Sequence, residues 1–295
     1  MHSRSLGIIL SLLATALFAL HDATSKHLTM VFAVPLVIWA RYFVYLTIMT
    51  VTIAPSTGRE IFMTRRPFLM IVRGLVLVGV SICFQNALLT LPLAEATSLV
   101  FVTPLMVALL AGPMLGEKVR LQSWLATVAG FCGVLLIARP GGSMSAVGVA
   151  YALGTALCYA AYQLLTRKLS VSEPPMRQLY YTALVGFPAM SCIVPFYWSS
   201  QLPTLHQALL ILSLGVYAGL GQFFLIRAFR ETPASLLSPL LNVQLVWAIL
   251  LGWLLFNQLP DLLAVAGMLI IGASCLFLAR QRPQQTSKGA TSAGQ

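Results

Sequence analysis

Residues 5–28 read SLGIILSLLATALFALHDATSKHL, an apolar stretch whose last third carries four ionisable side chains. As a helix with a rise of about 1.5 Å per residue, this stretch is long enough to cross a hydrocarbon core of roughly 30 Å. It is too long for the apolar region of a cleaved signal peptide, and no small-residue cleavage site precedes its polar end. We therefore expect it to remain in the protein as a membrane-spanning helix.

Apolar stretches of similar length recur through the 295 residues, of which 59% are hydrophobic and only 8% are charged. Soluble domains are roughly a quarter charged. The predicted spans are 5–28, 35–54, 67–90, 93–115, 121–138, 146–167, 177–198, 206–229, 234–257 and 260–279. The links between them are too short for a soluble catalytic domain, and we expect the polar tail at 282–295 to be disordered.

The net charge of +11 is explained by membrane topology. With the N-terminus in the cytoplasm, the basic residues at or near the inner side are Arg4, Arg59, Arg65, Arg66, Arg73, Lys118, Arg120, Arg167, Lys168, Arg177, Arg227, Arg230, Arg280, Arg282 and Lys288. Lys26 and Arg139 lie outside, and this asymmetry predicts that both termini lie in the cytoplasm of a multi-pass protein of the cell (inner) membrane. The basic residues form no single face with interleaved aromatics, which excludes a nucleic-acid partner.

An offset of 141 residues relates the two halves of the chain. It matches Gly7 with Gly148, Ala19 with Ala160, Pro92 with Pro233, and Ala138 with Ala279. Five spans per half is an odd number, so the second half must be inverted relative to the first. We expect an all-α integral membrane protein of ten transmembrane helices, built as two inverted five-helix repeats at 1–140 and 141–281. Inverted repeats are typical of secondary transporters, whose solute site lies near the midplane.

Three features resemble the EamA-type members of the drug/metabolite transporter superfamily. They are Lys26 at the end of the first span, Arg41 early in the second, and residues 91–137, LPLAEATSLVFVTPLMVALLAGPMLGEKVRLQSWLATVAGFCGVLLI. The Gly-Glu-Lys motif at 116–118 becomes Asn-Gln-Leu at 257–259, so the halves are not expected to play equal roles. The resemblance implies a central cavity lined by spans 1, 3, 4, 6, 8 and 9, and transport of small organic metabolites, often outward.

The ionisable residues of the first span mark a candidate gate. Asp22 and Lys26 share one helical face, and Asp22 lies about 9 Å from the outer end of its span, at the depth of Arg41 in the next. Because an unpaired charge at that depth costs several kcal/mol, we expect Asp22, Lys26 and Arg41 to form a paired cluster. This cluster is either a clamp between two spans or part of the outer gate and solute site. His21 points about 100° away from Asp22 and is a candidate for proton coupling.

Neutral polar and aromatic side chains recur on the spans that the resemblance places around the cavity. The candidate cavity residues are Gln85, Asn86, Tyr159, Tyr162, Gln163, Gln222, Asn242, Gln244 and Trp247. Each of them either joins helices by hydrogen bonds or faces the solute. Amide and aromatic groups suit a flat or amino-acid-like solute.

Other function classes need features that the chain lacks. An enzyme would need a catalytic group set within the bilayer, a channel would need rings of charge or a filter motif, and a receptor would not need the inverted repeat. The five cysteines lie in spans without a CxxC motif, so we expect neither a metal site nor a disulfide, and no cofactor.

The resemblance and the residue types together predict a secondary active transporter that moves a small organic metabolite by alternating access. We expect export of an amino-acid-like or amino-acid-derived solute, opine-type metallophores included. The alternative is uptake of a flat or nucleoside-like solute such as riboflavin or S-adenosylmethionine. The expected partners are the solute and the lipid bilayer, and a homodimer is left open.

Overall fold

The computed structural model describes residues 2–52, 58–107, 110, 121–138, 144–169, 172–198, 203–231, 241 and 243–280. The α-helices of this part are α1 (His2–Thr29), α2 (Val34–Thr52), α4 (Pro67–Thr90), α5 (Leu93–Val100), α7 (Leu121–Ala138), α8 (Ala146–Leu169), α9 (Pro175–Ile193), α10 (Leu205–Glu231), α12 (Val243–Phe256) and α13 (Leu262–Arg280). Two short 3-10 helices, η1 (Gly58–Ile61) and η2 (Val194–Tyr197), join them, and the described residues contain no strand.

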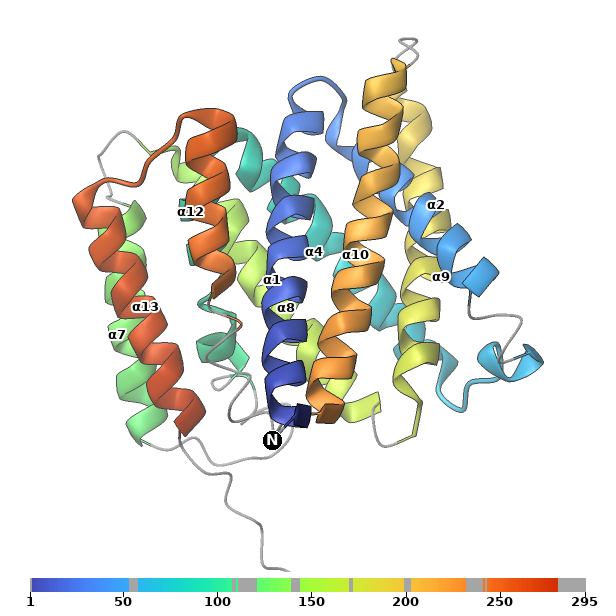
Figure 1. Ribbon diagram of the computed structural model, residues 1–295, viewed down its shortest axis with the longest axis horizontal. Coiled ribbons are helices and arrows are strands. Elements are labelled where there is room, and N and C mark those ends of the chain that lie inside the picture. Colours follow the sequence, from blue (N-terminus) through green and yellow to red (C-terminus); the bar gives the residue numbers. More distant parts are fainter. Residues whose placement is uncertain are drawn as a thin grey trace, which may run out of the picture.

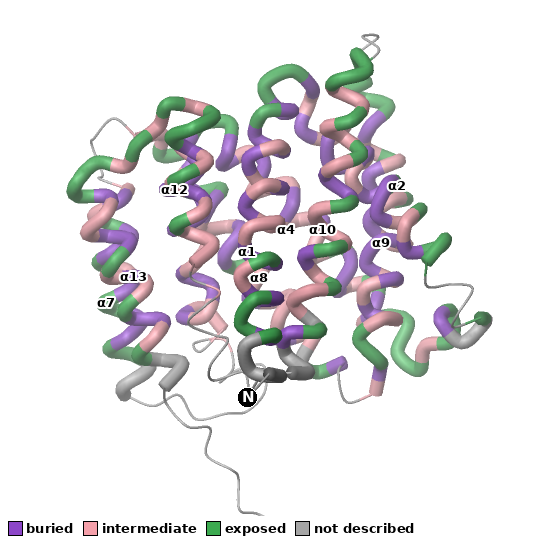
Figure 2. Tube along the Cα trace, viewed as in Figure 1, coloured by how far each residue is buried: buried purple, intermediate pink, exposed green. Residues whose placement is uncertain are grey.

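Six of these helices, α1, α2, α4, α8, α9 and α10, include an apolar segment long enough to cross a membrane. The apolar helices α5, α7, α12 and α13 contribute shorter segments. Most of these helices have both buried and exposed residues, whereas α5 has no exposed residue (Figure 2). The exposed residues include large apolar ones such as Phe68, Leu125, Trp253 and Leu262, as lipid contact requires. The chain is therefore a multi-pass membrane protein.

Proline sets the ends of the third predicted span, 67–90, which coincides with α4. Pro67 occupies the start of α4, where a missing N–H costs nothing. The helix ends at Leu91, whose extended backbone (φ −112°, ψ 149°) is the conformation favoured before a proline. Pro92 then leads directly into α5. The ninth predicted span is described from Val243 onward, and its earlier part lies outside the described residues.

Helix packing repeats under the 141-residue offset. α1 packs against α10, and the counterparts of these two helices, α8 and α4, pack against each other. In the same way α2 packs on α10, and α9 packs on α4. Two pairs of counterparts, α2 with α9 and α7 with α13, are also in contact, as are α5 and α12 of the fourth and ninth predicted spans. This exchange of partners is the pattern that a two-fold axis between two repeats produces. α1 begins and α13 ends on the same side of the bundle (Figure 1).

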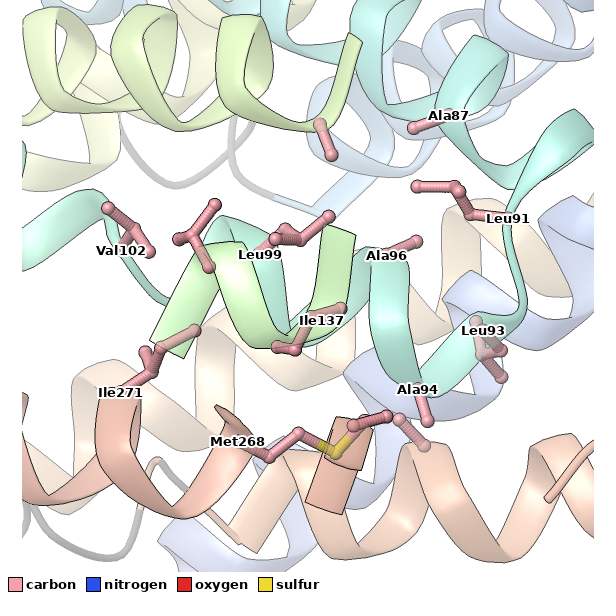
Figure 3. Packing of buried hydrophobic residues seen from close by; sticks show 14 of the residues in the cluster. Ala87, Leu91, Leu93, Ala94, Ala96, Leu99, Val102, Ile137, Met268 and Ile271 are labelled. Carbon is pink, nitrogen blue, oxygen red and sulfur yellow. The ribbon is translucent and has the colours of Figure 1, made fainter. Parts of the chain in front are cut away.

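The largest hydrophobic core lies around α5. Leu93, Leu99 and Ile137 pack there with Met268 of α13 (Figure 3). Beside this core α7 crosses α13 at facing glycines: a Cβ atom on Gly133 would lie 2.7 Å from the Gly267 oxygen, and one on Gly267 would lie 2.6 Å from the Gly133 oxygen. Only glycine permits this approach, since real Cβ atoms do not come so close to a carbonyl.

Candidate functional site

Lys26 lies near the end of α1, on the side of the bundle opposite the start of α1 and the end of α13 (Figure 1). Its Nζ donates hydrogen bonds to the Leu91 carbonyl oxygen at 2.6 Å and to Gln258 Oε1 at 3.1 Å. The ammonium also lies 5.2 Å from the centre of the Phe256 ring. With only 3% of Lys26 exposed, these bonds tie α1 to the α4–α5 link and to the α12–α13 link. We call Lys26, Leu91 and Gln258 the Lys26 lock.

A cavity of about 400 Å³ opens beside the Lys26 lock. Its polar lining includes Lys26, Gln258, Glu95 and Asp261, and Ile137 is among its apolar residues. Glu95 is buried and close enough to Lys26 for their charges to interact. The cavity therefore presents groups of both charges at this end of the bundle, where a polar solute could be received or released.

Asp22 lies one turn deeper on α1 and connects the two halves of the chain. One carboxylate oxygen is 3.1 Å from His21 Nδ1, and the other accepts a hydrogen bond from Gln244 Nε2 of α12 at 3.2 Å. The predicted orientation of His21 away from Asp22 is therefore wrong, because the imidazole reaches back to the neighbouring carboxylate. His21 Nε2 is buried and has no hydrogen-bond partner among the described residues.

Arg41 faces α4 rather than Asp22. Its Nη2 donates to Ser81 Oγ at 2.6 Å, and its guanidinium lies 4.9 Å from the centre of the Tyr42 ring. In the described part of the chain no ion pair joins Asp22, Lys26 and Arg41, so the predicted paired cluster is wrong. The hydrogen bonds of Lys26 and Arg41 go instead to carbonyl, amide and hydroxyl groups, which can stabilise a buried charge.

Gln85 and Asn86, which were predicted to line the cavity, differ in their surroundings. Gln85 is 2% exposed and donates from Nε2 to the Ser25 hydroxyl, across the contact of α4 with α1. Asn86 is partly exposed, and its Nδ2 donates to the Ile82 carbonyl one turn back on its own helix at 2.8 Å. The geometry of Gln85 favours the helix-packing alternative, whereas Asn86 keeps a partly accessible amide.

Tyr159 and Tyr162 of α8 stack on each other, with ring centres 5.7 Å apart and ring planes inclined by 10°. The Tyr162 hydroxyl accepts a hydrogen bond from Arg73 Nη2 at 2.5 Å, and the Arg73 guanidinium lies 4.4 Å from the centre of that ring. The Asp22 carboxylate lies within electrostatic range of the Tyr159 hydroxyl. Arg73, Tyr162, Tyr159 and Asp22 thus form a continuous series, which we call the aromatic row.

Arg73 is the residue of this group that the sequence analysis missed. It was counted among the basic residues at the inner side, yet only 2% of it is exposed. A signal was available: Tyr162 and Thr166 are one turn apart on α8, and Gln178 and Thr182 are one turn apart on α9, so two polar faces can meet α4. Arg73 donates hydrogen bonds to groups of all four residues.

Four of the predicted cavity residues remain to be described. Gln163, Gln222 and Trp247 are partly exposed. The buried Trp247 Nε1 has no hydrogen-bond partner among the described residues, and such a donor requires an acceptor, which a bound solute can supply. Asn242 lies outside the described residues, as does the Gly-Glu-Lys motif at 116–118.

Glu173 lies in the link between α8 and α9, on the side of the bundle where α1 begins and α13 ends (Figure 1). One carboxylate oxygen accepts hydrogen bonds from the Thr64 hydroxyl at 2.6 Å and the Arg65 backbone N–H at 2.8 Å. The other accepts from Arg177 Nη1 at 2.7 Å. Burial works to raise the pKa of the Glu173 carboxyl, but the hydrogen bonds from Thr64, Arg177 and Arg65 outweigh burial and lower the pKa below its ordinary value.

Replacing Glu173 by glutamine is expected to lower the free energy of unfolding by about 1–3 kcal/mol at pH 7, because charge-assisted hydrogen bonds are lost. A lowered carboxyl pKa stabilises the protein above the ordinary glutamate value of about 4.3, and this contribution is lost as the pH falls through the folded-state pKa. Thermal unfolding of the detergent-purified protein should show a gap between wild type and Glu173→Gln at pH 7 that closes in acid. A gap of equal size at every pH would contradict this account.

The sequence pattern of the EamA-like transporter family matches residues 5–139 and again 146–280. The S-adenosylmethionine uptake transporter of Rickettsia bellii (strain RML369-C) is 28% identical over 96% of this chain and 97% of its own length. The pseudopaline exporter CntI of Pseudomonas aeruginosa (strain UCBPP-PA14) is 28% identical over 94% of this chain and 96% of its own length.

Two further comparisons cover most of the chain. The riboflavin transporter of Rhizobium johnstonii (strain DSM 114642 / LMG 32736 / 3841) is 26% identical over 96% of this chain and 94% of its own length. A crystal structure with 18% identical residues superposes with a TM-score of 0.62, covering 94% of this chain and 96% of the other, which shows the fold alone. Because the family pattern covers both halves, the chain belongs to the EamA-like transporter family, and it is a transporter and not an enzyme.

Proposed function

We propose that the chain is a secondary active transporter of the cell (inner) membrane that exports an amino-acid-like or amino-acid-derived metabolite by alternating access, opine-type metallophores included. The observation that carries the proposal is the contact of Asp22 on α1 with Gln244 on α12 beside the aromatic row. Charged, amide and aromatic groups from both halves of the chain meet there, as a solute site between two repeats requires.

The proposed architecture is ten membrane spans in two inverted units, 1–140 and 141–281, with both termini in the cytoplasm. The repeated helix packing and the two family matches support the two units. The basic residues predicted at the inner side support the orientation. In this orientation the Lys26 lock lies at the outer end of the bundle, where its bonds between α1 and two links would hold the outer gate shut.

The proposed site suits a solute with a positively charged group. The Asp22 carboxylate and the face of the Tyr159 ring both attract a cation, and an ammonium held by an aromatic ring and a carboxylate is a recurrent mode of recognition. Gln244 adds an amide group beside Asp22. A relative whose name states uptake of S-adenosylmethionine and one whose name states export of pseudopaline are compatible with amino-acid-derived solutes.

The alternative function is uptake of a flat or nucleoside-like solute such as S-adenosylmethionine or riboflavin. The stacked pair of Tyr159 and Tyr162 favours it, because parallel rings offer an aromatic surface to a planar group. Relatives with names stating S-adenosylmethionine uptake and riboflavin transport support it as well.

The transport proposal is tested by counterflow in proteoliposomes preloaded with unlabelled amino-acid-derived solutes, with S-adenosylmethionine and riboflavin in parallel. We expect the labelled form of an amino-acid-derived solute to accumulate, because a carrier exchanges labelled for unlabelled solute. Direction is tested by comparing the metabolites released into the medium by cells with and without the gene. Counterflow of riboflavin alone, or a solute that enters cells only when the gene is present, would replace the export proposal by the alternative.

A further inference from the structure

Arg73 is a buried cation whose described partners are all neutral. It donates from Nε to Thr166 Oγ1 at 2.7 Å, from Nη1 to the Gln178 carbonyl oxygen at 2.8 Å and to Thr182 Oγ1 at 2.7 Å, and from Nη2 to the Tyr162 hydroxyl. In the described part of the chain no carboxylate pairs with it. An arginine side chain stays protonated in proteins, so a full positive charge is held inside the bundle.

Neutral partners fix the guanidinium without cancelling its charge. The Thr166 hydroxyl donates its own proton to the Tyr162 carbonyl oxygen at 2.7 Å, and the Thr182 hydroxyl donates to the Gln178 carbonyl oxygen at 2.8 Å. Both hydroxyl oxygens are therefore free to accept from Arg73. A charge within a membrane protein is costly and is usually retained for a function. A purely structural contact between α4, α8 and α9 could be made by an amide at lower cost.

The aromatic row carries a positive charge at one end and a negative charge at the other. Arg73 lies against Tyr162, Asp22 lies near Tyr159, and the two stacked rings separate them. Arg73 is too buried to touch a solute, but Tyr162 is partly exposed, and its hydroxyl is polarised by the bond from Arg73. The positive charge is therefore presented to the site through Tyr162.

We propose that Arg73 is a positioning residue that makes the transporter select zwitterions whose two charges are well separated. The anionic end of the solute lies toward Tyr162 and Arg73, and its ammonium end lies toward Tyr159 and Asp22. The ring centres are 5.7 Å apart, so the row is too long for a simple α-amino acid, whose amine and carboxylate share one carbon. This inference rests on the proposed transport of amino-acid-derived solutes and adds the charge pattern and the orientation.

The test uses a panel of ω-amino acids, from glycine to 6-aminohexanoate, with the amine and the carboxylic acid of matched length. Binding to the detergent-purified protein is measured as thermal stabilisation over a range of concentrations. Wild type is expected to bind 5-aminopentanoate and 6-aminohexanoate at least about tenfold more tightly than glycine or either singly charged compound, because two charge contacts are made together.

The variants separate a charge effect from a packing effect. Arg73→Gln should lose the advantage of 6-aminohexanoate over hexylamine while hexylamine binding is kept, and Arg73→Lys should keep part of that advantage. Tyr162→Phe should behave like Arg73→Gln. It therefore replaces Arg73→Gln in the test if that variant does not fold. Thr166→Val, which removes one neutral partner of Arg73 and leaves the charge, is the matched control and should keep the wild-type order.

Two results would overturn the inference. If Arg73→Gln weakens 6-aminohexanoate and hexylamine by the same factor, Arg73 only packs the helices together. If wild type prefers hexylamine to every ω-amino acid, the site selects cations, and the proposed transporter function stands without the zwitterion. Failure of the function itself has a different signature, since counterflow would then be absent for amino-acid-derived solutes of every charge pattern.

Discussion

Replacing Lys26 by methionine is expected to lower transport by about a hundredfold while the protein stays folded. The substitution removes two hydrogen bonds from a charged donor, to the Leu91 carbonyl and to Gln258, each contributing about 1.5 kcal/mol or more to the closed end of the bundle. Together they shift the equilibrium between closed and open ends by roughly a hundredfold. Methionine keeps the apolar contacts of the lysine stem, so α1 should remain packed and abundance, measured in parallel, should be maintained.

The opening of the Lys26 lock can be measured directly. Ile137 lines the cavity beside the lock and is 1% exposed, so a cysteine at this position should react slowly with a membrane-impermeant thiol reagent added outside. Combining Ile137→Cys with Lys26→Met should accelerate the labelling, read at this site by mass spectrometry. Lys168→Met, at an exposed lysine near the end of α8, is the control and should change neither labelling nor transport. Normal transport by Lys26→Met would remove the lock from the mechanism.

Replacing Asp22 by asparagine is expected to lower transport of a cationic or zwitterionic solute by at least about 30-fold. Losing one partner of a desolvated charge pair costs about 2 kcal/mol or more. Asparagine keeps an oxygen that can accept from Gln244 Nε2, so the contact of α1 with α12 should survive. Transport per molecule in proteoliposomes is the measurement, with abundance determined in parallel.

Arg41 provides the control for this result. Because Arg41 donates to Ser81 and not to Asp22, adding Arg41→Gln to Asp22→Asn should restore neither abundance nor transport. Recovery of abundance in the double variant would show that the two side chains compensate each other's charge. Full transport by Asp22→Asn alone would exclude the carboxylate from the solute site.

The sequence predicted the helices well because apolar length and proline determine where they begin and end. The predicted spans 67–90 and 121–138 coincide with α4 and α7. The predicted contact of Gln85 with solute shows the limit of the same method, because a polar stripe looks alike whether it meets a cavity or the Ser25 hydroxyl. The spacing of polar side chains along a helix does not reveal whether they contact solute or another helix.

The charged residues were harder to predict, for a physical reason. A buried charge was expected to need a nearby opposite charge, which led to the predicted cluster of Asp22, Lys26 and Arg41. In the structure Lys26 donates its hydrogen bonds to a carbonyl and an amide, and Arg41 donates to a hydroxyl, and no charge pattern in the sequence reveals such neutral partners. For the same reason Arg73 was interpreted only as one of the basic residues that mark the inner side of the membrane. Its partners are threonines, a tyrosine and a backbone carbonyl, none of which is charged.

The glycine crossing of α7 and α13 has a mechanical consequence. With no side chain between Gly133 and Gly267, the two backbones are in direct contact. No intervening side chains can rearrange to let the two helices slide past each other. This pair stands at one edge of the bundle, and α2 and α9 stand at the other (Figure 1). The crossing is thus placed to serve as a fulcrum: a rocking motion would leave α7 and α13 nearly still and sweep α2 and α9 through the widest arc.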